Sequence, residues 1–284
     1  MKLNETAVSD NDLRLIGKLR TTKNLGLNGT QVSDNGLAHI RHLRRLETLE
    51  LGETRITDMG LAHLRDMRQL EHLGLSGARI TDQGLRHIED MEQLESLMLQ
   101  NTDVGDRAID SLTKLKRLRA VSLQSTRVTS EGVNSLLHNR DIQCLYIDGT
   151  RVDDAVVEEL SSHKSLAELS IWGTSITGQA MLRLRDALPS CRIDGEVADL
   201  SSIRFDKNPQ LAIIWPRVVK RLAALNGERR LKLIDLSESQ ITDRFLTDLQ
   251  ELNGVEVIDL RDTQATDAGV KALRQAMPNC EIVR

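Results

Sequence analysis

Apolar residues recur along this chain with a period of 24 residues, and each period divides into two differently patterned halves. The first half alternates apolar and polar residues, as around Leu49 and Leu51, which predicts a short strand with one buried face. In the second half, Leu61, Leu64 and Met67 follow at intervals of three, which predicts a short helix with one apolar stripe. The clearest units begin at Leu46, Leu70, Leu94, Leu118, Ile142 and Leu166.

Stacking of these units explains how both apolar faces become buried, because one strand–helix unit cannot bury them alone. Neighbouring strands lie about 4.8 Å apart, whereas packed helices need about 8–10 Å, so a stack of such units must curve. The repeat therefore predicts an α/β solenoid. We expect a right-handed arc with a parallel sheet on its concave side and helices on its convex side.

The L-x-x-L-x-L core and the T-D-x-G-L segment that follows it, as in Thr57–Leu61, carry a family resemblance. The chain resembles the leucine-rich repeat family over about ten units. The core is similar to the repeats of ribonuclease inhibitor and F-box proteins, and T-D-x-G-L resembles bacterial leucine-rich repeat proteins. The resemblance implies a scaffold that presents a surface, and it does not name the partner.

Threonine occupies the unit position where that family usually carries Asn or Cys, and Ala78 and Ser239 are departures. We expect the hydroxyl to bond to backbone in the turn after each strand. The threonines are Thr6, Thr30, Thr54, Thr102, Thr126, Thr150, Thr174 and Thr263.

The repeat divides the chain into three segments. Residues 1–193 hold about eight units, residues 194–230 fit the repeat poorly, and residues 231–284 hold two further units with a C-terminal cap. The middle segment is predicted to be a non-repeat insert or a degenerate unit. It is either a hinge or a packed continuation, and the apolar residues between Ile213 and Leu225 favour packing because they need burial.

The N-terminal end lacks a polar cap, because the repeat register places Met1 at the fourth position of a unit. End repeats of a solenoid normally need a capping face, and a bare end exposes a sheet edge. We therefore expect either that upstream sequence precedes Met1 or that a partner or a second copy covers this end, which would allow self-association.

The composition narrows the functional classes. Hydrophobic residues make up 39% of the chain and aromatic residues 2%, as expected for a narrow core of Leu, Ile and Val. The net charge of −4 implies no bulk attraction to nucleic acid or membrane. No apolar run reaches the roughly 18 residues of a membrane segment, and no signal-peptide pattern occurs. Three cysteines are too few for a disulfide framework, so we expect a reducing, cytoplasmic location.

The candidate binding site lies on the outward-facing positions of the predicted strands. Tyr146 and Trp172 occur there on adjacent units, in a chain with one Tyr and two Trp. Aromatic anchors ringed by polar groups are typical of binding hot spots. We predict that Met98, Tyr146 and Trp172 anchor a partner while polar neighbours orient it. Those neighbours are Gln100, Gln124 and Asp148. Alternatively, Trp172 folds over a neighbouring glycine or packs beneath the insert.

A column of arginines follows the strands along one rim of the predicted sheet. Arg55, Arg79, Arg127 and Arg151 occupy it, and Asp103 interrupts it. Such a row could grip carboxylates or phosphates. The interruption favours the simpler interpretation of a solvated, duplicated column.

Three further columns invite chemical interpretations that the repeat itself explains. His39, His63 and His87 recur on the predicted helices, but the first and last would lie about 16–20 Å apart, too far to share one metal ion. The glycines at Gly36, Gly60, Gly84, Gly132 and Gly269 indicate close packing near the helix start rather than a phosphate loop.

Aspartates also recur at the predicted helix starts, where we interpret them as helix caps rather than as calcium ligands. They are Asp10, Asp34, Asp58, Asp82, Asp106, Asp154, Asp243 and Asp267.

The sequence therefore predicts a non-enzymatic, protein-binding scaffold that uses its concave face and needs no cofactor or metal. No nucleophile–base set appears, and we expect no nucleic-acid partner. Two alternatives stay open. One is an adaptor or oligomerising scaffold, which the F-box resemblance implies, and the other is recognition of an anionic ligand along the arginine rim.

Overall fold

The computed structural model describes residues 1–195, 202–204, 233–237, 239–250, 252 and 254–284. The chain forms two compact units. The first unit comprises residues 1–176 and 183–196, and the second comprises residues 177–182 and 197–284. The predicted insert at 194–230 lies largely outside the described residues. The three-segment division and the choice between hinge and packed continuation therefore stay predictions.

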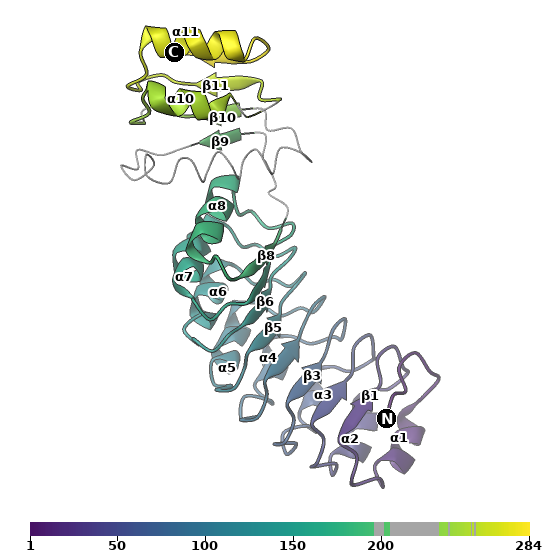
Figure 1. The fold of residues 1–284 in the computed structure, drawn as a ribbon. Coiled ribbons are helices and arrows are strands. Elements are labelled where there is room, and N and C mark those ends of the chain that lie inside the picture. The colour runs from purple at the N-terminus through teal and green to yellow at the C-terminus, as the bar shows by residue number, and fades with distance from the viewer. Residues whose placement is uncertain (196–201, 205–232, 238, 251, 253) are drawn as a thin grey trace. The chain divides into compact units, whose positions relative to one another are not determined.

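Parallel strands of three residues each form the sheet of the first unit (Figure 1). They are hydrogen-bonded in the order in which they occur along the chain. The strands are β1 (Asn24–Gly26), β2 (Thr48–Glu50), β3 (His72–Gly74), β4 (Ser96–Met98), β5 (Ala120–Ser122), β6 (Cys144–Tyr146), β7 (Glu168–Ser170) and β8 (Arg192–Asp194).

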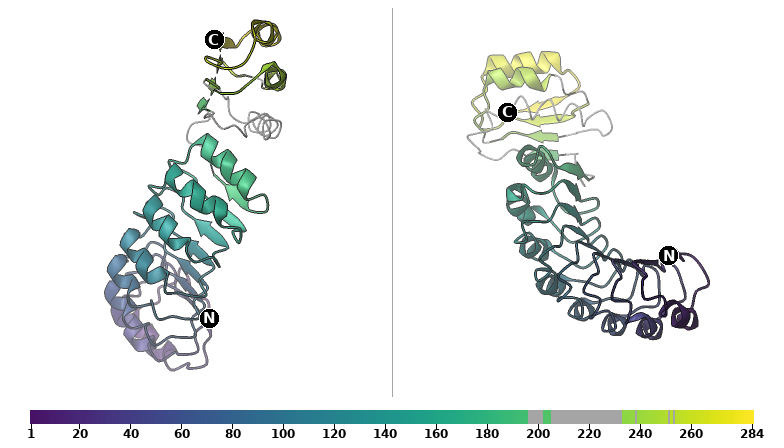
Figure 2. Two further views of the ribbon diagram at one scale, coloured as in Figure 1. Left: turned by 90° about the vertical axis from the view of Figure 1, so that its left-hand side faces the viewer. Right: turned by 60° about the horizontal axis from the view of Figure 1, so that its bottom comes forward.

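A short helix follows most strands and lies on the outer, convex side of the first unit, as the right-hand view of Figure 2 shows. The predicted α/β solenoid is therefore confirmed. The helices are α1 (Asp10–Ile16), α2 (Asp34–Ile40), α3 (Asp58–Leu61), α4 (Asp82–Leu85), η1 (Asp106–Ala108), α5 (Ile109–Leu112), α6 (Ser130–Leu136), η2 (Asp154–Val156) and α7 (Val157–Ser162). The next helix, α8 (Gly178–Ala187), is divided between the two units at residue 182.

The register of the sheet stacks equivalent residues of successive repeats. Leu49 pairs with Leu73, and Leu73 pairs with Leu97, so one leucine column runs through the core. These leucines are at most 1% exposed. Leu61 and Leu64 from the helical half of the repeat are also fully buried, so the core lies between the sheet and the helices.

The second unit repeats the same architecture on a smaller scale. Its parallel sheet has the order β12-β11-β10-β9. The described elements are β9 (Ser202–Arg204), β10 (Leu233–Asp235), α10 (Asp243–Leu249), β11 (Val257–Asp259), α11 (Asp267–Ala276) and β12 (Glu281–Val283).

The threonines of the column close the turns after their strands, as predicted. Thr54 Oγ1 donates to the carbonyl of Leu51 at 2.6 Å, and Thr150 Oγ1 donates to Ile147 at 2.6 Å. The side chain of Ala78 is buried in the same place without a hydroxyl, so the column tolerates the loss of this bond.

The interpretation of the aspartates as helix caps is wrong for most of the column. The carboxylate of Asp58 accepts the backbone N–H of Thr81 at 2.8 Å and the Thr81 hydroxyl at 2.6 Å, both in the following repeat. The cap of its own helix is Thr57, whose Oγ1 accepts from Met59 N. The aspartates therefore join repeats, because stacking places each carboxylate beside the next extended cap residue. The same carboxylate–hydroxyl contact recurs at Asp10, Asp34, Asp106 and Asp243.

The glycine column makes room for these carboxylates. A Cβ atom on Gly60 would lie 2.3 Å from Asp34 Oδ1, and one on Gly132 would lie 2.2 Å from Asp106 Oδ1. The predicted close packing near the helix start is thus confirmed, and its cause is the side chain of the preceding repeat.

The first residues of the chain extend the sheet in the predicted register. Leu3 N–H donates to Gly26 O at 2.9 Å, and Gly26 N–H donates to Met1 O at 3.0 Å. Ser9 and Asp12 form a capping box at the start of α1. Covering of this end by a partner or a second copy stays a prediction.

No helix within the described residues is long and apolar enough to cross a membrane.

Candidate binding site on the concave sheet

The predicted site residues lie on or directly after neighbouring strands of the first unit. Met98 and Tyr146 are the last residues of β4 and β6. Both pair with Ser122 of the intervening strand β5, so the three residues form one row across the sheet. The residues two positions further on follow β4, β5, β6 and β7 and form the next row. They are Gln100, Gln124, Asp148 and Trp172.

Asp148 connects three strands at the centre of this surface. Its Oδ1 accepts from the Ser170 hydroxyl and from the backbone N–H of Trp172, each at 2.6 Å. Its Oδ2 accepts from Gln124 Nε2. The carboxylate therefore fixes the turn that carries Trp172. The same geometry occurs near the N-terminus, where Asn28 Oδ1 accepts from Gly52 N at 2.7 Å.

Tyr146 is half-buried, and its hydroxyl donates to Glu168 Oε2 at 2.8 Å. Burial raises the pKa of Tyr146 and the hydrogen bond to Glu168 raises it further, so the phenol stays protonated. Glu168 also lies 3.7 Å from Arg192, which pairs with Asp194 at 2.8 Å. A charged row thus runs beside the aromatic residues.

Sequence reasoning missed Glu168 and Arg192 as site residues. Both occupy the first position of a strand, which faces outward like the last position, where Tyr146 lies. The alternation of outward-facing positions along the strands could therefore have identified them. Their pairing could not be read from the sequence, because it depends on side-chain direction across two strands.

Trp172 is 46% exposed, one of five large apolar side chains exposed within the described residues. Nearly half of the side chain thus remains accessible to a partner. The alternative in which Trp172 only shields the sheet stays open. Met98 and Gln100 lie two strands away from Tyr146 and Asp148. No hydrogen bond joins them to the Asp148 network within the described part of the chain. We refer to Gln124, Tyr146, Asp148, Glu168, Trp172 and Arg192 as the concave patch.

The cysteines near this patch are free thiols. Burial raises the pKa of Cys191 to about 11, with smaller contributions from Cys144 and Glu168. Burial and the charge of Glu168 also raise the pKa of Cys144. Both sulfurs are therefore thiols at neutral pH, so neither provides a thiolate nucleophile.

The arginine rim is a second, irregular ladder. Isolated parallel bridges join Ser33 to Arg55 and Thr57 to Arg79 along it. At its centre Arg127 pairs with Asp103 at 3.3 Å. A hollow of about 360 Å³ there is lined by both signs of charge, including Asp82 and Arg107. Positive and negative side chains therefore lie side by side at this part of the rim.

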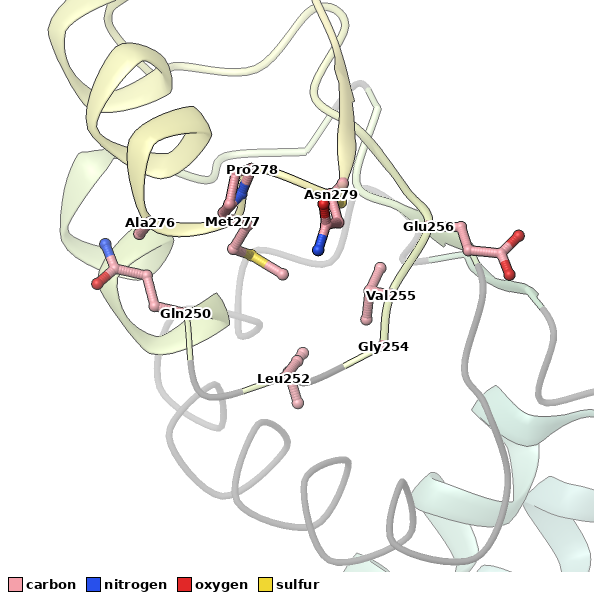
Figure 3. A pocket seen from close by; sticks show the side chains of 10 residues that line it. Gln250, Leu252, Gly254, Val255, Glu256, Ala276, Met277, Pro278 and Asn279 are labelled. Carbon is pink, nitrogen blue, oxygen red and sulfur yellow. The ribbon is translucent and has the colours of Figure 1, made fainter.

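A cavity of about 290 Å³ lies in the second unit, between the ends of α10 and α11 (Figure 3). Leu252, Val255 and Met277 give it an apolar floor, and among the described residues Glu256 and Cys280 are titratable groups of its lining. Burial raises the pKa of Cys280 to about 11, so its sulfur is protonated.

No group of three or more His, Cys, Asp or Glu side chains within the described residues could hold a metal ion.

Comparison with known proteins places this geometry in a family. The family model described as "Leucine-rich repeat region" matches residues 1–184. No curated protein matches the chain. Among solved structures, an internalin C2 from Listeria monocytogenes is similar with a TM-score of 0.55 and 18% identity, covering 69% of this chain and 79% of that one.

Two further solved structures are similar over more of the chain. An internalin from Listeria monocytogenes has a TM-score of 0.46 and 16% identity, covering 94% of this chain and 82% of that one. A leucine-rich repeat protein from Leptospira interrogans has a TM-score of 0.46 and 15% identity, covering 95% of this chain and 74% of that one. At such identities the likeness concerns the fold. The finer assignment to ribonuclease-inhibitor and F-box repeats stays a prediction.

Proposed function

This chain belongs to the leucine-rich repeat family, and from that premise we propose that it binds a protein partner through the concave patch of its first unit. The observation that carries the proposal is the state of Trp172. Its side chain is 46% exposed, although Asp148 holds its backbone N–H at 2.6 Å. An exposed anchor on a fixed turn loses little conformational freedom on binding.

The polar surroundings of this anchor support a specific interface. Asp148 and Glu168 are each already bonded to a neighbour, so a partner meets a preformed surface rather than mobile side chains. Tyr and Trp are enriched at binding hot spots because they combine a large apolar area with a polar group. Tyr146 and Trp172 would therefore supply affinity, and Gln124, Asp148 and Arg192 would fix the orientation of the partner.

The proposed role is non-enzymatic. The thiols beside the patch are protonated at neutral pH, and its carboxylates are committed to hydrogen bonds or ion pairs. Recognition of an anionic ligand along the arginine rim has less support, because the Arg127–Asp103 pair interrupts the rim. An adaptor role would use the same concave patch and would differ only in what else the protein assembles.

The test is partner capture followed by a quantitative affinity measurement. Wild-type protein and the Tyr146→Ala/Trp172→Ala double variant are used to capture partners, and titration calorimetry then measures the affinity for the partner identified. We expect the double variant to lose about 2 kcal/mol or more, roughly thirtyfold in Kd. Thermal unfolding establishes that both proteins are folded.

Met59→Ala is the matched control, because Met59 is 71% exposed and lies on α3 on the convex side. It should leave the affinity unchanged. An affinity that survives in the double variant would contradict the proposal.

A further inference from the structure

Cations cluster along one edge of the first unit, at the amino ends of its first strands. This edge is formed by the loop residues that connect each helix to the next strand. All seven side chains of the cluster, which we call the basic edge, are exposed. They are Lys18, Arg20, Arg41, Arg44, Arg45, Arg65 and Arg68.

The repeat stacks these cations into a continuous surface. Arg20, Arg44 and Arg68 occupy the same position in three successive units, and the intervening helices α1, α2 and α3 pack in order. Successive units lie about 5–10 Å apart, between the strand and helix spacings. That separation is comparable with the Debye length of about 8 Å at physiological salt, so the potentials of neighbouring cations add.

The basic edge has no evident structural task. Elsewhere in the same column, Lys116 Nζ donates to the Thr113 carbonyl at 3.4 Å and Lys164 Nζ to Ser161 at 2.7 Å, so these cations cap helix ends. Within the described residues the basic edge has one ion pair, between Arg44 and Asp66 at 3.8 Å. Its charge is therefore available to a partner.

Two leucines lie beside these cations in the sequence and are exposed with them. Leu15 of α1 is 65% exposed and Leu19 is 47% exposed, on either side of Lys18. At the unit position of Leu15, the next repeats carry His39 and His63. Exposed leucines next to cations are the combination of side chains that enters the headgroup region of a bilayer.

We propose that the basic edge, together with Leu15 and Leu19, docks on the surface of a membrane that contains anionic lipids. Each Lys or Arg near such a surface strengthens binding several-fold, and seven are gathered here on a chain whose net charge is −4. The overall charge opposes approach in other orientations, so the basic edge would set the orientation of docking.

A nucleic acid fits this surface less well. Single-stranded nucleic acids are bound with aromatic side chains on which the bases stack. Residues 1–70 contain no Phe, Trp or Tyr, and the leucines would have no corresponding partner on a phosphate backbone.

Vesicle co-sedimentation of the full chain tests the proposal. Vesicles of phosphatidylcholine with phosphatidylserine are compared with vesicles of phosphatidylcholine alone, over a series of salt concentrations. We expect sedimentation with the anionic vesicles only, and loss of binding as salt rises. The Arg41→Gln/Arg44→Gln/Arg45→Gln variant should bind on the order of a hundredfold more weakly.

Arg55→Gln/Arg79→Gln/Arg151→Gln is the matched control, because it removes the same charge from the opposite rim. It should bind like the wild type. The Leu15→Ser/Leu19→Ser variant should also weaken binding while the charge stays constant. Thermal unfolding verifies that each variant is folded.

Equal losses in the two arginine variants would show a bulk charge effect and overturn the proposal. Absence of binding to anionic vesicles would overturn it as well, as would equal binding to phosphatidylcholine alone. Binding of an RNA homopolymer without binding to vesicles would assign the basic edge to nucleic acid instead. None of these outcomes depends on the concave patch, so the two proposals are tested separately.

Discussion

At the scale of single residues, the aspartate column shows how one side chain can join two repeats. Asp58 satisfies the extended backbone N–H and the hydroxyl of Thr81, which stand at the start of the next helix. Thr81 in turn caps that helix by accepting from Gln83 N. The polar groups at one helix start are thus bonded by two repeats. The carboxylate of the preceding repeat accepts from Thr81, and the Thr81 hydroxyl oxygen accepts from Gln83 N in its own repeat.

Replacement of Asp58 by Ala should therefore destabilise the protein. Loss of the carboxylate leaves the Thr81 N–H and hydroxyl without their acceptor, at a cost of about 1–3 kcal/mol. Urea unfolding monitored by circular dichroism measures the change. Asp90→Ala removes an exposed carboxylate of the neighbouring loop and should be nearly neutral. Equal effects of the two substitutions would contradict the role assigned to Asp58.

His163 is a second residue whose environment has a measurable consequence. It is fully buried, and its Nε2 lies 3.1 Å from the Ile142 carbonyl. Burial lowers the pKa of His163 below 6.5, and the charge of Arg140 adds to this lowering, whereas the hydrogen bond to the Ile142 carbonyl and the charge of Glu159 oppose it. The unfolded chain therefore binds more protons than the folded chain between the lowered pKa and about 6.5.

Stability should consequently decrease as the pH falls below about 6.5. The His163→Met variant should lose much of this slope, because Met67 and Met91 occupy the same unit position elsewhere and are buried without titrating. Urea unfolding at a series of pH values measures this dependence of the free energy of unfolding on pH. His72→Gln, at an exposed site on β3, should keep the wild-type slope. An unchanged slope in His163→Met would show that another group dominates.

At the scale of elements, several helix starts are matched to the repeat before them, although Ala108 and Ala180 follow Asp82 and Asp154 where other repeats carry glycine. Gly60 has no side chain where Asp34 places its carboxylate. One repeat shows the converse arrangement: Ser130 replaces the aspartate, and Val156 replaces the following glycine. A shorter side chain in one repeat thus accompanies a larger one in the next.

This relation predicts a coupled pair of substitutions. Gly60→Val alone should destabilise by about 1–3 kcal/mol, because its Cβ would overlap Asp34 Oδ1. Asp34→Ser combined with Gly60→Val should recover part of this loss, with a coupling energy of about 1 kcal/mol or more in a double-mutant cycle. Strict additivity of the two substitutions would contradict direct contact.

At the scale of the whole molecule, we predict that the two units respond independently to damage. Each repeat contacts only its neighbours, so a defect spreads through adjacent repeats. The described part of the second unit has its own apolar cluster, which includes Ile234, Leu249, Ile258 and Leu273.

Leu97→Ala in β4 tests this independence. Leu97 is fully buried between the strand neighbours Leu73 and Val121, and its truncation should cost about 2–5 kcal/mol. Amide hydrogen exchange should accelerate in β3, β4 and β5. The acceleration should become smaller with distance from β4 along the first unit. Amides of α10 and α11 should keep their protection. Equal acceleration in those helices would show that the two units unfold together.

The sequence by itself determined the repeat, the strand and helix halves of each unit, and the threonine turns. These features follow from the order of apolar and polar residues within one unit, which is local information. It also indicated an outward-facing surface bearing Tyr146 and Trp172, because strand alternation fixes which side chains leave the core. How that surface functions stays a proposal.

The tertiary structure alone decided which groups meet across repeats. The sequence placed Asp58 at a helix start, but stacking turned its carboxylate towards Thr81, 23 residues further on. Stacking likewise brings the Tyr146 hydroxyl within hydrogen-bond distance of Glu168, 22 residues away. A periodic pattern specifies which face each residue occupies, whereas its hydrogen-bond partner depends on the offset between packed repeats, which only the folded sheet determines.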